Sequence, residues 1–147
     1  MTVTVEYNAE TYKELFQPIT SQYPGLLNGI ITDFKSYIES SRLKVPRYFG
    51  CDVPYVKHQG AYKAGLMHIH LAIPPVVFPE GRPQADRKCP KNDDPTQDAA
   101  LVYVQGLYDE NRYSLLAILH PGAHSKANDK KIMNYLSAVA ERFRDKF

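Results

Sequence analysis

Two histidines two residues apart, His68 and His70, lie inside the short apolar run Leu66–Ile73. Side chains alternate between the two faces of a β-strand, so this spacing places both imidazoles on one face and the apolar side chains on the other. Imidazole titrates near neutral pH, so such a pair can transfer protons, bind an anion or ligate a metal. The alternative is that both rings are polar groups on the wet face of a half-exposed strand.

The length and composition are those of an ordinary soluble globular protein. The chain has 147 residues, of which 44% are hydrophobic and 23% charged, so we expect a single domain over residues 1–147. No apolar run approaches the length of a membrane span, and the N-terminus lacks the pattern of a signal peptide. The two cysteines, Cys51 and Cys89, have no metal-type spacing. We therefore expect a cytoplasmic protein without a membrane partner.

Basic side chains are concentrated in two segments. Residues 35–63 carry six basic and two acidic side chains, and the stretch from Lys126 onward carries six basic and three acidic ones. Together the two segments could contact a polyanion if the fold brings them together, whereas the alternative is a solvated surface of mixed charge.

Hydrophobic periodicity and turn residues predict the elements that position these groups. In the N-terminal part we expect a strand at 2–7, a helix at 9–16 ended by Pro18, and a helix from Pro24–Gly25 to about Ser40. A turn-rich stretch at 46–55 then leads to the histidine strand. Strands at 100–106 and 113–120, joined by a turn at 108–111, precede a helix from Ser125. This order predicts an α+β fold, with a small antiparallel sheet, N-terminal helices and a C-terminal helix.

A long loop interrupts the predicted sheet. Residues 74–98 hold six of the 11 prolines, and a segment of this length favours a functional loop. The alternative is local disorder.

Several segments, taken in their order and spacing, resemble one protein family. They are Phe34–Tyr37, Pro46 with Phe49–Asp52, His68–Ala72, Ala100–Gly106, Asp109–Glu110, Leu116–Pro121, His124, Ala127, Asp129 and Ala140–Arg144. From Phe34 to the C-terminus the chain is similar to the YafO family, whose members are toxins of bacterial type II toxin–antitoxin pairs. The resemblance implies an mRNA endoribonuclease that acts on the translating ribosome and is silenced by a cognate antitoxin protein. It also implies a fold like that of the RelE toxins.

Ribonuclease chemistry fits the side chains present. RNA carries its own nucleophile, the 2′-hydroxyl, so a metal-free ribonuclease needs a base, an acid and a cation for the charge on the phosphate. We expect no metal and no cofactor. The catalytic candidates, with acid and base roles unassigned, are His68, His70, Tyr103, His120 and His124. The candidates for contacts with RNA and the ribosome are Lys44, Arg47, Lys126, Arg142 and Arg144.

Two other functions remain open from the sequence. The first is a metal-dependent hydrolase in which His120, His124 or a carboxylate completes a metal shell begun by the His-x-His pair. The second is a non-catalytic module whose tyrosine-rich surface binds RNA or protein.

Overall fold

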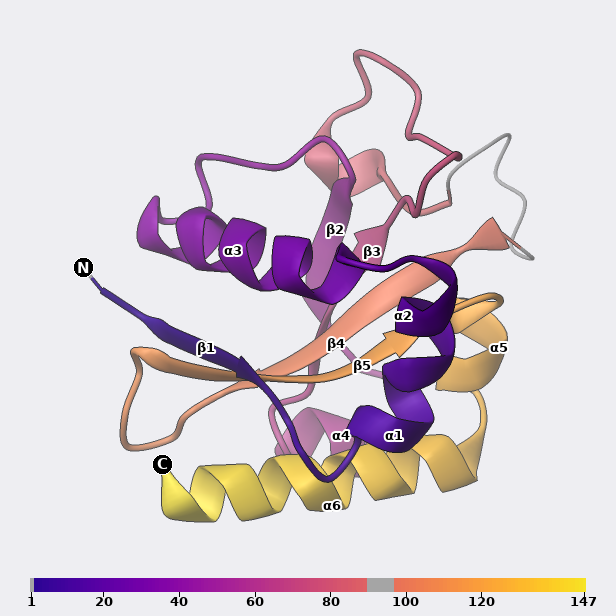
Figure 1. The fold of residues 1–147 in the computed structure, drawn as a ribbon. Coiled ribbons are helices and arrows are strands. Elements are labelled where there is room, and N and C mark those ends of the chain that lie inside the picture. The colour runs from indigo at the N-terminus through magenta and orange to yellow at the C-terminus, as the bar shows by residue number, and fades with distance from the viewer. Residues whose placement is uncertain (1, 90–96) are drawn as a thin grey trace.

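A five-stranded mixed sheet forms the centre of the molecule (Figure 1). The computed structural model describes residues 2–89 and 97–147. The strands are β1 (Thr4–Tyr7), β2 (Phe49–Pro54), β3 (Met67–Leu71), β4 (Ala99–Gln105) and β5 (Arg112–Leu119). They lie in the order β1-β5-β4-β3-β2, in which β1 runs parallel to β5 and the other neighbours are antiparallel. The helical elements are α1 (Tyr12–Leu15), α2 (Gln17–Gln22), α3 (Leu26–Glu39), α4 (Gln59–Lys63), the 3₁₀ turn η1 (Gln84–Asp86), α5 (Ala123–Ala127) and α6 (Lys130–Lys146).

The helix α3 covers one face of the sheet, because its apolar side chains recur every three or four residues. Its buried side chains Leu27, Ile30 and Phe34 pack in one core with side chains from β3 and β4, among them Leu71 and Tyr103. This face is rich in aromatic contacts.

The helices α4 and α6 cover the opposite face (Figure 1). Met133, Leu136 and Val139 of α6 pack in a second core with the alternate side chains of β4, such as Val102. Helix α6 begins where the Asp129 carboxylate accepts hydrogen bonds from the first backbone N–H groups. Because β4 and β5 are covered on both faces, they are almost entirely apolar. The histidines of β3 share the α6 face with this second core.

The predicted α+β class, the histidine strand and the turn between β4 and β5 are confirmed. Four predictions differ from the structure. The stretch 46–55 is not only turns but contains β2, and Pro18 opens α2 instead of ending the helical region. The predicted C-terminal helix is split into α5 and α6, since Asp129 starts a new helix. The sheet is not purely antiparallel because β1 pairs with β5.

The segment after β3 folds back against the outer strand β2. The Cys51 N–H donates to the Arg87 carbonyl at 2.9 Å, and the Arg87 guanidinium donates to the carbonyls of Phe49 and Arg82. Gly50 is required at this contact, because a Cβ there would lie 2.1 Å from the Arg87 carbonyl oxygen. The part of the predicted 74–98 loop at residues 90–96 lies outside the described residues.

Among the described residues, no helix combines the length and the apolar character needed to cross a bilayer.

Candidate active site

His68 and His70 lie side by side on β3, on the face covered by α6. The centroids of the two rings are 5.0 Å apart, and the His68 ring stacks on Tyr55 at 3.9 Å with an interplanar angle of 10°. His70 lies opposite Ala100 in β4, whose small side chain leaves room beside the ring. The shared face predicted from the His-x-His spacing is therefore present, but both rings are packed into the protein and neither points freely into solvent.

A third histidine, His124, joins this pair from α5. Its ring centroid is 5.6 Å from that of His70. We call His68, His70 and His124 the histidine cluster. A small pocket of about 20 Å³ opens between the three rings, with the rest of its lining formed by Tyr55, Ala100, Ala123 and Ala127. This volume suits about one water molecule.

The fully buried carboxylate of Asp98 orients His124. Asp98 Oδ2 accepts a hydrogen bond from the His124 backbone N–H at 3.0 Å and also contacts the ring nitrogen Nδ1. A carboxylate oxygen only accepts, so Nδ1 carries the proton and Nε2 keeps the lone pair. The His124 side chain is 53% exposed, whereas that of Asp98 is 0% exposed. A basic nitrogen at the surface is thus held in place by a negative charge beneath it.

The other two rings are neutral near pH 7. Burial, followed by the charges of His70 and His124, lowers the pKa of His68 to about 3, although a backbone hydrogen bond with Val53 acts in the opposite direction. Burial also lowers the pKa of His70, although its hydrogen bond to the Lys88 carbonyl opposes this effect. That bond is 2.9 Å long, and because the carbonyl accepts, His70 Nδ1 donates.

Two further predicted residues lie within electrostatic reach of Asp98. Burial and the charge of Lys126 lower the pKa of His120, while Asp98 raises it. Burial likewise lowers the pKa of Lys126, against the opposing effect of Asp98. Lys126 therefore places a cationic side chain within reach of Asp98 and His120.

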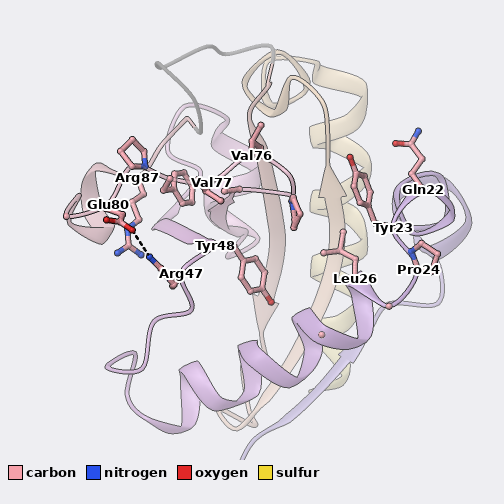
Figure 2. Close-up of a pocket in the computed structure, with 17 residues that line it drawn as sticks. Gln22, Tyr23, Pro24, Leu26, Arg47, Tyr48, Val76, Val77, Glu80 and Arg87 are labelled. Carbon is pink, nitrogen blue, oxygen red and sulfur yellow. Dashed lines mark hydrogen bonds and ion pairs between the residues drawn. The ribbon is translucent and has the colours of Figure 1, made fainter.

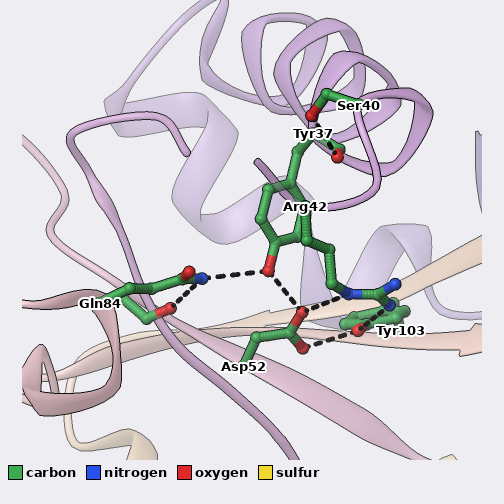
Figure 3. Close-up of polar contacts among 7 residues, drawn as sticks. Tyr37, Ser40, Arg42, Asp52, Gln84 and Tyr103 are labelled. Atoms are coloured by element: carbon green, nitrogen blue, oxygen red, sulfur yellow. Dashed lines mark hydrogen bonds and ion pairs between the residues drawn. The ribbon is translucent and has the colours of Figure 1, made fainter. Parts of the chain in front are cut away.

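Tyr103 lies on the other face of the sheet, away from the histidine cluster. It packs beneath α3, and its hydroxyl donates to Asp52 Oδ1 at 2.6 Å (Figure 3). Asp52 Oδ2 accepts from the Tyr37 hydroxyl at 2.7 Å and from Arg42 Nε at 3.1 Å. We call these four residues the Asp52 cluster. The predicted catalytic set is therefore divided between two sites.

Hydrogen bonds already occupy the polar atoms of the Asp52 cluster. The Asp52 side chain is 6% exposed, and Gln84 Nε2 donates to the Tyr37 hydroxyl at 3.0 Å. Burial and the Asp52 charge raise the pKa of Tyr103, so its phenol keeps its proton. Ser41 and Arg42 have φ values of 56° and 64°, a strained conformation for residues other than glycine. The cluster holds this turn against the sheet, which is a structural role.

The basic residues predicted to contact RNA are dispersed over the molecule. Lys44 and Arg47 are exposed on the turn after α3, and Arg47 forms an exposed ion pair with Glu80 at 3.4 Å. Arg142 pairs with Glu10 at 2.6 Å. The Arg144 guanidinium packs against Gly65. A Cβ added to Gly65 would lie 2.5 Å from Arg144 Nη1. Lys126 interacts electrostatically with Asp98.

A much larger cavity, of about 1150 Å³, lies elsewhere. It opens between the α2–α3 junction and the segment after β3, and it is lined by Tyr23, Leu26, Tyr48 and Val77, among others (Figure 2). Its charged side chains include the Arg47–Glu80 pair. The Tyr48 hydroxyl donates to Asp33, and burial together with that carboxylate raises the Tyr48 pKa. No histidine or cysteine lines this groove, so size alone does not identify the site.

Sequence reasoning missed two residues of the site. Asp98 directly precedes β4 and Cys89 follows the Lys88 carbonyl that binds His70, but both fall in the stretch predicted as a long loop. Three side chains each offer one ligand atom, and these atoms lie within 4.8 Å of one another: Cys89, Asp98 and His124. Together they could hold a metal ion. His68 and His70 are not members of that group.

Comparisons with known proteins agree with the resemblance noted in the sequence. Residues 35–145 match the model of a family described as toxin YafO, type II toxin–antitoxin system. The chain is 35% identical over 129 residues to the mRNA interferase toxin YafO of Escherichia coli strain K12, an alignment that covers 82% of this chain and 87% of that protein. No solved structure matches the chain significantly. The extent and identity of these matches place the chain in the YafO family of type II toxin–antitoxin toxins.

Proposed function

We propose that this toxin is an endoribonuclease that cleaves mRNA, and that the histidine cluster is its catalytic centre. The observation that carries the assignment is the Asp98–His124 pair, which holds a basic nitrogen at the surface beside two neutral imidazoles. The similar Escherichia coli protein is an mRNA interferase by name, which supports RNA as the substrate.

The cleavage step needs no metal in this scheme. His124 Nε2 takes the proton of the ribose 2′-hydroxyl, whose oxygen then attacks the adjacent phosphorus. The bond from phosphorus to the 5′-oxygen breaks, and that oxygen takes a proton from the Lys126 ammonium, whose pKa burial lowers. The products are a 2′,3′-cyclic phosphate and a 5′-hydroxyl. Asp98 stabilises the imidazolium that forms, and Lys126 stabilises the charge on the phosphate.

The pocket between the histidines is too small for a nucleotide. At about 20 Å³ it has room for a water molecule, so a ribose and phosphate must lie over the exposed edge of His124 or displace α5. A site in this state favours an activity that depends on a partner to present the substrate. We propose that the translating ribosome is this partner, since it can hold mRNA in the in-line geometry that the attack requires.

The remaining parts of the proposal follow from the family and the topology. As a member of a type II toxin–antitoxin family, the toxin is expected to bind a cognate antitoxin protein. A parallel β1–β5 pair next to an antiparallel meander supports the proposal of a RelE-like fold. We take the chain to act as one domain in the cytoplasm, where mRNA and ribosomes are found.

Cleavage of an mRNA during translation in a purified system tests the proposal. We expect the wild-type toxin to cut the translated message and to leave the same RNA nearly intact without ribosomes. His124→Ala should lower the cleavage rate by roughly 10²–10⁴-fold, since it removes the base. The backbone N–H of residue 124 still reaches Asp98 in this variant, so folding should be preserved.

A second histidine variant supplies the matched control. His58 caps α4 and accepts a hydrogen bond from the Ala61 N–H, and it does not line the pocket. His58→Asn keeps a good capping side chain and should keep full activity. Equal activity of the folded His124→Ala variant and the wild type would contradict the proposed site. Equal cleavage with and without ribosomes would contradict the role of the ribosome.

A further inference from the structure

A potential metal site overlaps the histidine cluster. Cys89, Asp98 and His124 each offer a ligand atom, and these atoms lie within 4.8 Å of one another. We propose that this triad binds Zn²⁺ and that the bound ion inhibits the toxin. The inhibitory part rests on the proposed catalytic role of His124, whereas the binding part does not.

The Asp98 carboxylate provides an independent sign that a cation belongs here. The side chain is fully buried, and its Oδ1 atom has no hydrogen-bond partner among the described residues. A buried carboxylate oxygen without a partner is costly, because it has lost its hydration without replacement. A cation between Cys89 and Asp98 would supply the missing interaction.

The chemistry of the three ligands selects zinc. A thiolate, an imidazole and a carboxylate form a mixed set that Zn²⁺ accepts readily, whereas Mg²⁺ and Ca²⁺ require oxygen ligands. Zinc binds such atoms at about 2.0–2.3 Å, so the ligand atoms around it are roughly 3–4 Å apart. A separation within 4.8 Å therefore needs only a small adjustment of the side chains. Three protein ligands leave one coordination position for water.

Zinc at this site would prevent proton transfer by His124. A neutral imidazole has one nitrogen with a lone pair and one that bears hydrogen. If Zn²⁺ binds Nδ1, the nitrogen that contacts Asp98, the hydrogen of the neutral ring lies on Nε2, and the ring has no position left to accept a proton from the 2′-hydroxyl. If Zn²⁺ binds Nε2, the ion itself occupies the lone pair of the proposed base. The ion would also place positive charge where Asp98 now stabilises the imidazolium. The same residue cannot bind zinc and act as the base at once.

Metal binding can be measured without any RNA. The metal-free toxin is titrated with Zn²⁺ in competition with a chromophoric chelator, and Co²⁺ is used as a spectroscopic substitute that reports thiolate ligation by a charge-transfer band. We expect one ion per chain. Cys89→Ser should weaken Zn²⁺ binding by at least about tenfold and abolish the Co²⁺ band, because a serine hydroxyl is a poor ligand for these ions.

The second cysteine provides the matched control. Cys51 is also buried, but it lies in β2 and is not part of the triad. Cys51→Ser should therefore bind Zn²⁺ like the wild type. Zinc binding that survives Cys89→Ser, or that is lost equally in both variants, would overturn the proposed site.

Cleavage assays then test inhibition. Zn²⁺ at one equivalent should lower the cleavage rate of the wild-type toxin at least tenfold, and a chelator should restore it. The cleavage rate of Cys89→Ser should change less than twofold between its metal-free form and the same Zn²⁺ concentration. Zinc-stimulated cleavage would overturn the inhibitory role and favour a metal-dependent hydrolase. If the wild-type protein binds zinc through Cys89 but cleaves no RNA, the binding site stands and the proposed nuclease function fails.

Discussion

His124 owes its proposed reactivity to the contrast between its own exposure and the burial of Asp98. A carboxylate in water would stabilise a neighbouring imidazolium only weakly, because solvent screens the charge. Asp98 is fully buried and lies directly beneath the ring, so its field reaches Nδ1 with little screening. The pair resembles the acid–base arrangement of hydrolases in its parts, with the base at the surface and the orienting charge below.

Substitution of Asp98 tests this positioning role. Asp98→Asn keeps an oxygen that accepts from the His124 backbone N–H but removes the negative charge that stabilises the protonated ring. We expect the cleavage rate of translated mRNA to fall about 10²-fold with a smaller change in KM. An unchanged cleavage rate in a folded variant would show that Asp98 has no positioning role.

The burial of His68 predicts a loss of stability in acid. The folded-state pKa of about 3 lies below the ordinary value of 6.5, so the folded protein disfavours the proton that the unfolded chain binds. The contribution of neutral His68 to the free energy of unfolding is fully present above about pH 6.5 and is lost as the pH falls from 6.5 toward 3. The groups facing the ring are His70, His124 and Tyr55.

A comparison of two pH values isolates this effect. His68→Phe keeps an aromatic ring to stack on Tyr55 but cannot titrate. Between pH 7.5 and pH 5, the wild type should lose about 2 kcal/mol more of its unfolding free energy than the variant, as measured by urea denaturation. Equal losses in the two proteins would show that His68 is not buried as the structure describes.

At the scale of elements, the Asp52 cluster connects three parts of the fold. Tyr37 belongs to α3, Asp52 to β2 and Tyr103 to β4, and their side chains meet at a single carboxylate. Because this carboxylate is buried and Tyr103 is the donor to its Oδ1 atom, removal of the Tyr103 hydroxyl leaves that oxygen unpaired. The cluster therefore fixes the outer strand β2 and the turn at Arg42 relative to the centre of the sheet.

Tyr103→Phe separates a structural role from a catalytic one. Loss of the hydroxyl leaves Asp52 Oδ1 without its donor, and we expect the unfolding free energy to fall by about 1–3 kcal/mol. Cleavage per folded molecule should be unchanged, because the residue lies on the face opposite the histidines. Tyr62→Phe, at an exposed position of α4, is the control and should change neither quantity. A large loss of cleavage with normal stability would return Tyr103 to the catalytic set.

The sequence predicts best the elements whose side chains have a strong period. The α3 stripe, the alternating β3 strand and the apolar runs of β4 and β5 were all predicted near their observed bounds. Strand β2 was missed because Gly50 and Pro54 are turn formers, and the need for Gly50 comes from a distant contact with Arg87. Helix α4 was missed because five residues are too few for a periodic signal.

The candidate site was predicted only in part for a similar reason. The alternation of side chains along a strand placed His68 and His70 on one face. The spacing does not predict how deeply the rings are buried or which residues pack against them. Asp98 reaches His124 across 26 positions in the chain, and no local pattern predicts such a contact. Tyr103 was grouped with the histidines by residue type, whereas the sheet places it on the opposite face.

At the scale of the whole molecule, positive charge is spread thinly. The net charge is +2, and Arg47 and Arg142 are paired with carboxylates. Affinity for naked RNA depends largely on the number of phosphates that a protein neutralises, so the toxin should bind it weakly. Weak binding of naked RNA is what the proposed dependence on the ribosome requires.

Charge reversal at the turn after α3 tests where these contacts lie. Lys44 and Arg47 are exposed, and Lys44→Glu or Arg47→Glu should weaken co-sedimentation with ribosomes several-fold, more strongly at low salt. The thermal midpoint should change little, because exposed ion pairs contribute little stability. Lys13→Glu, on exposed α1, makes the same charge change elsewhere and serves as the control. Equal weakening by all three variants would indicate a nonspecific effect of net charge.

The parallel pairing of β1 with β5 has a consequence for the synthesis of the toxin. Thr4 pairs with Arg112, which is synthesised more than one hundred positions later in the chain. The edge of the sheet cannot close until β5 has emerged, and His124 follows β5 in the chain. A contact between such distant residues also forms slowly. The proposed catalytic centre therefore cannot be complete on the nascent chain until β5 and His124 have both been synthesised, which delays its assembly relative to the synthesis of β1.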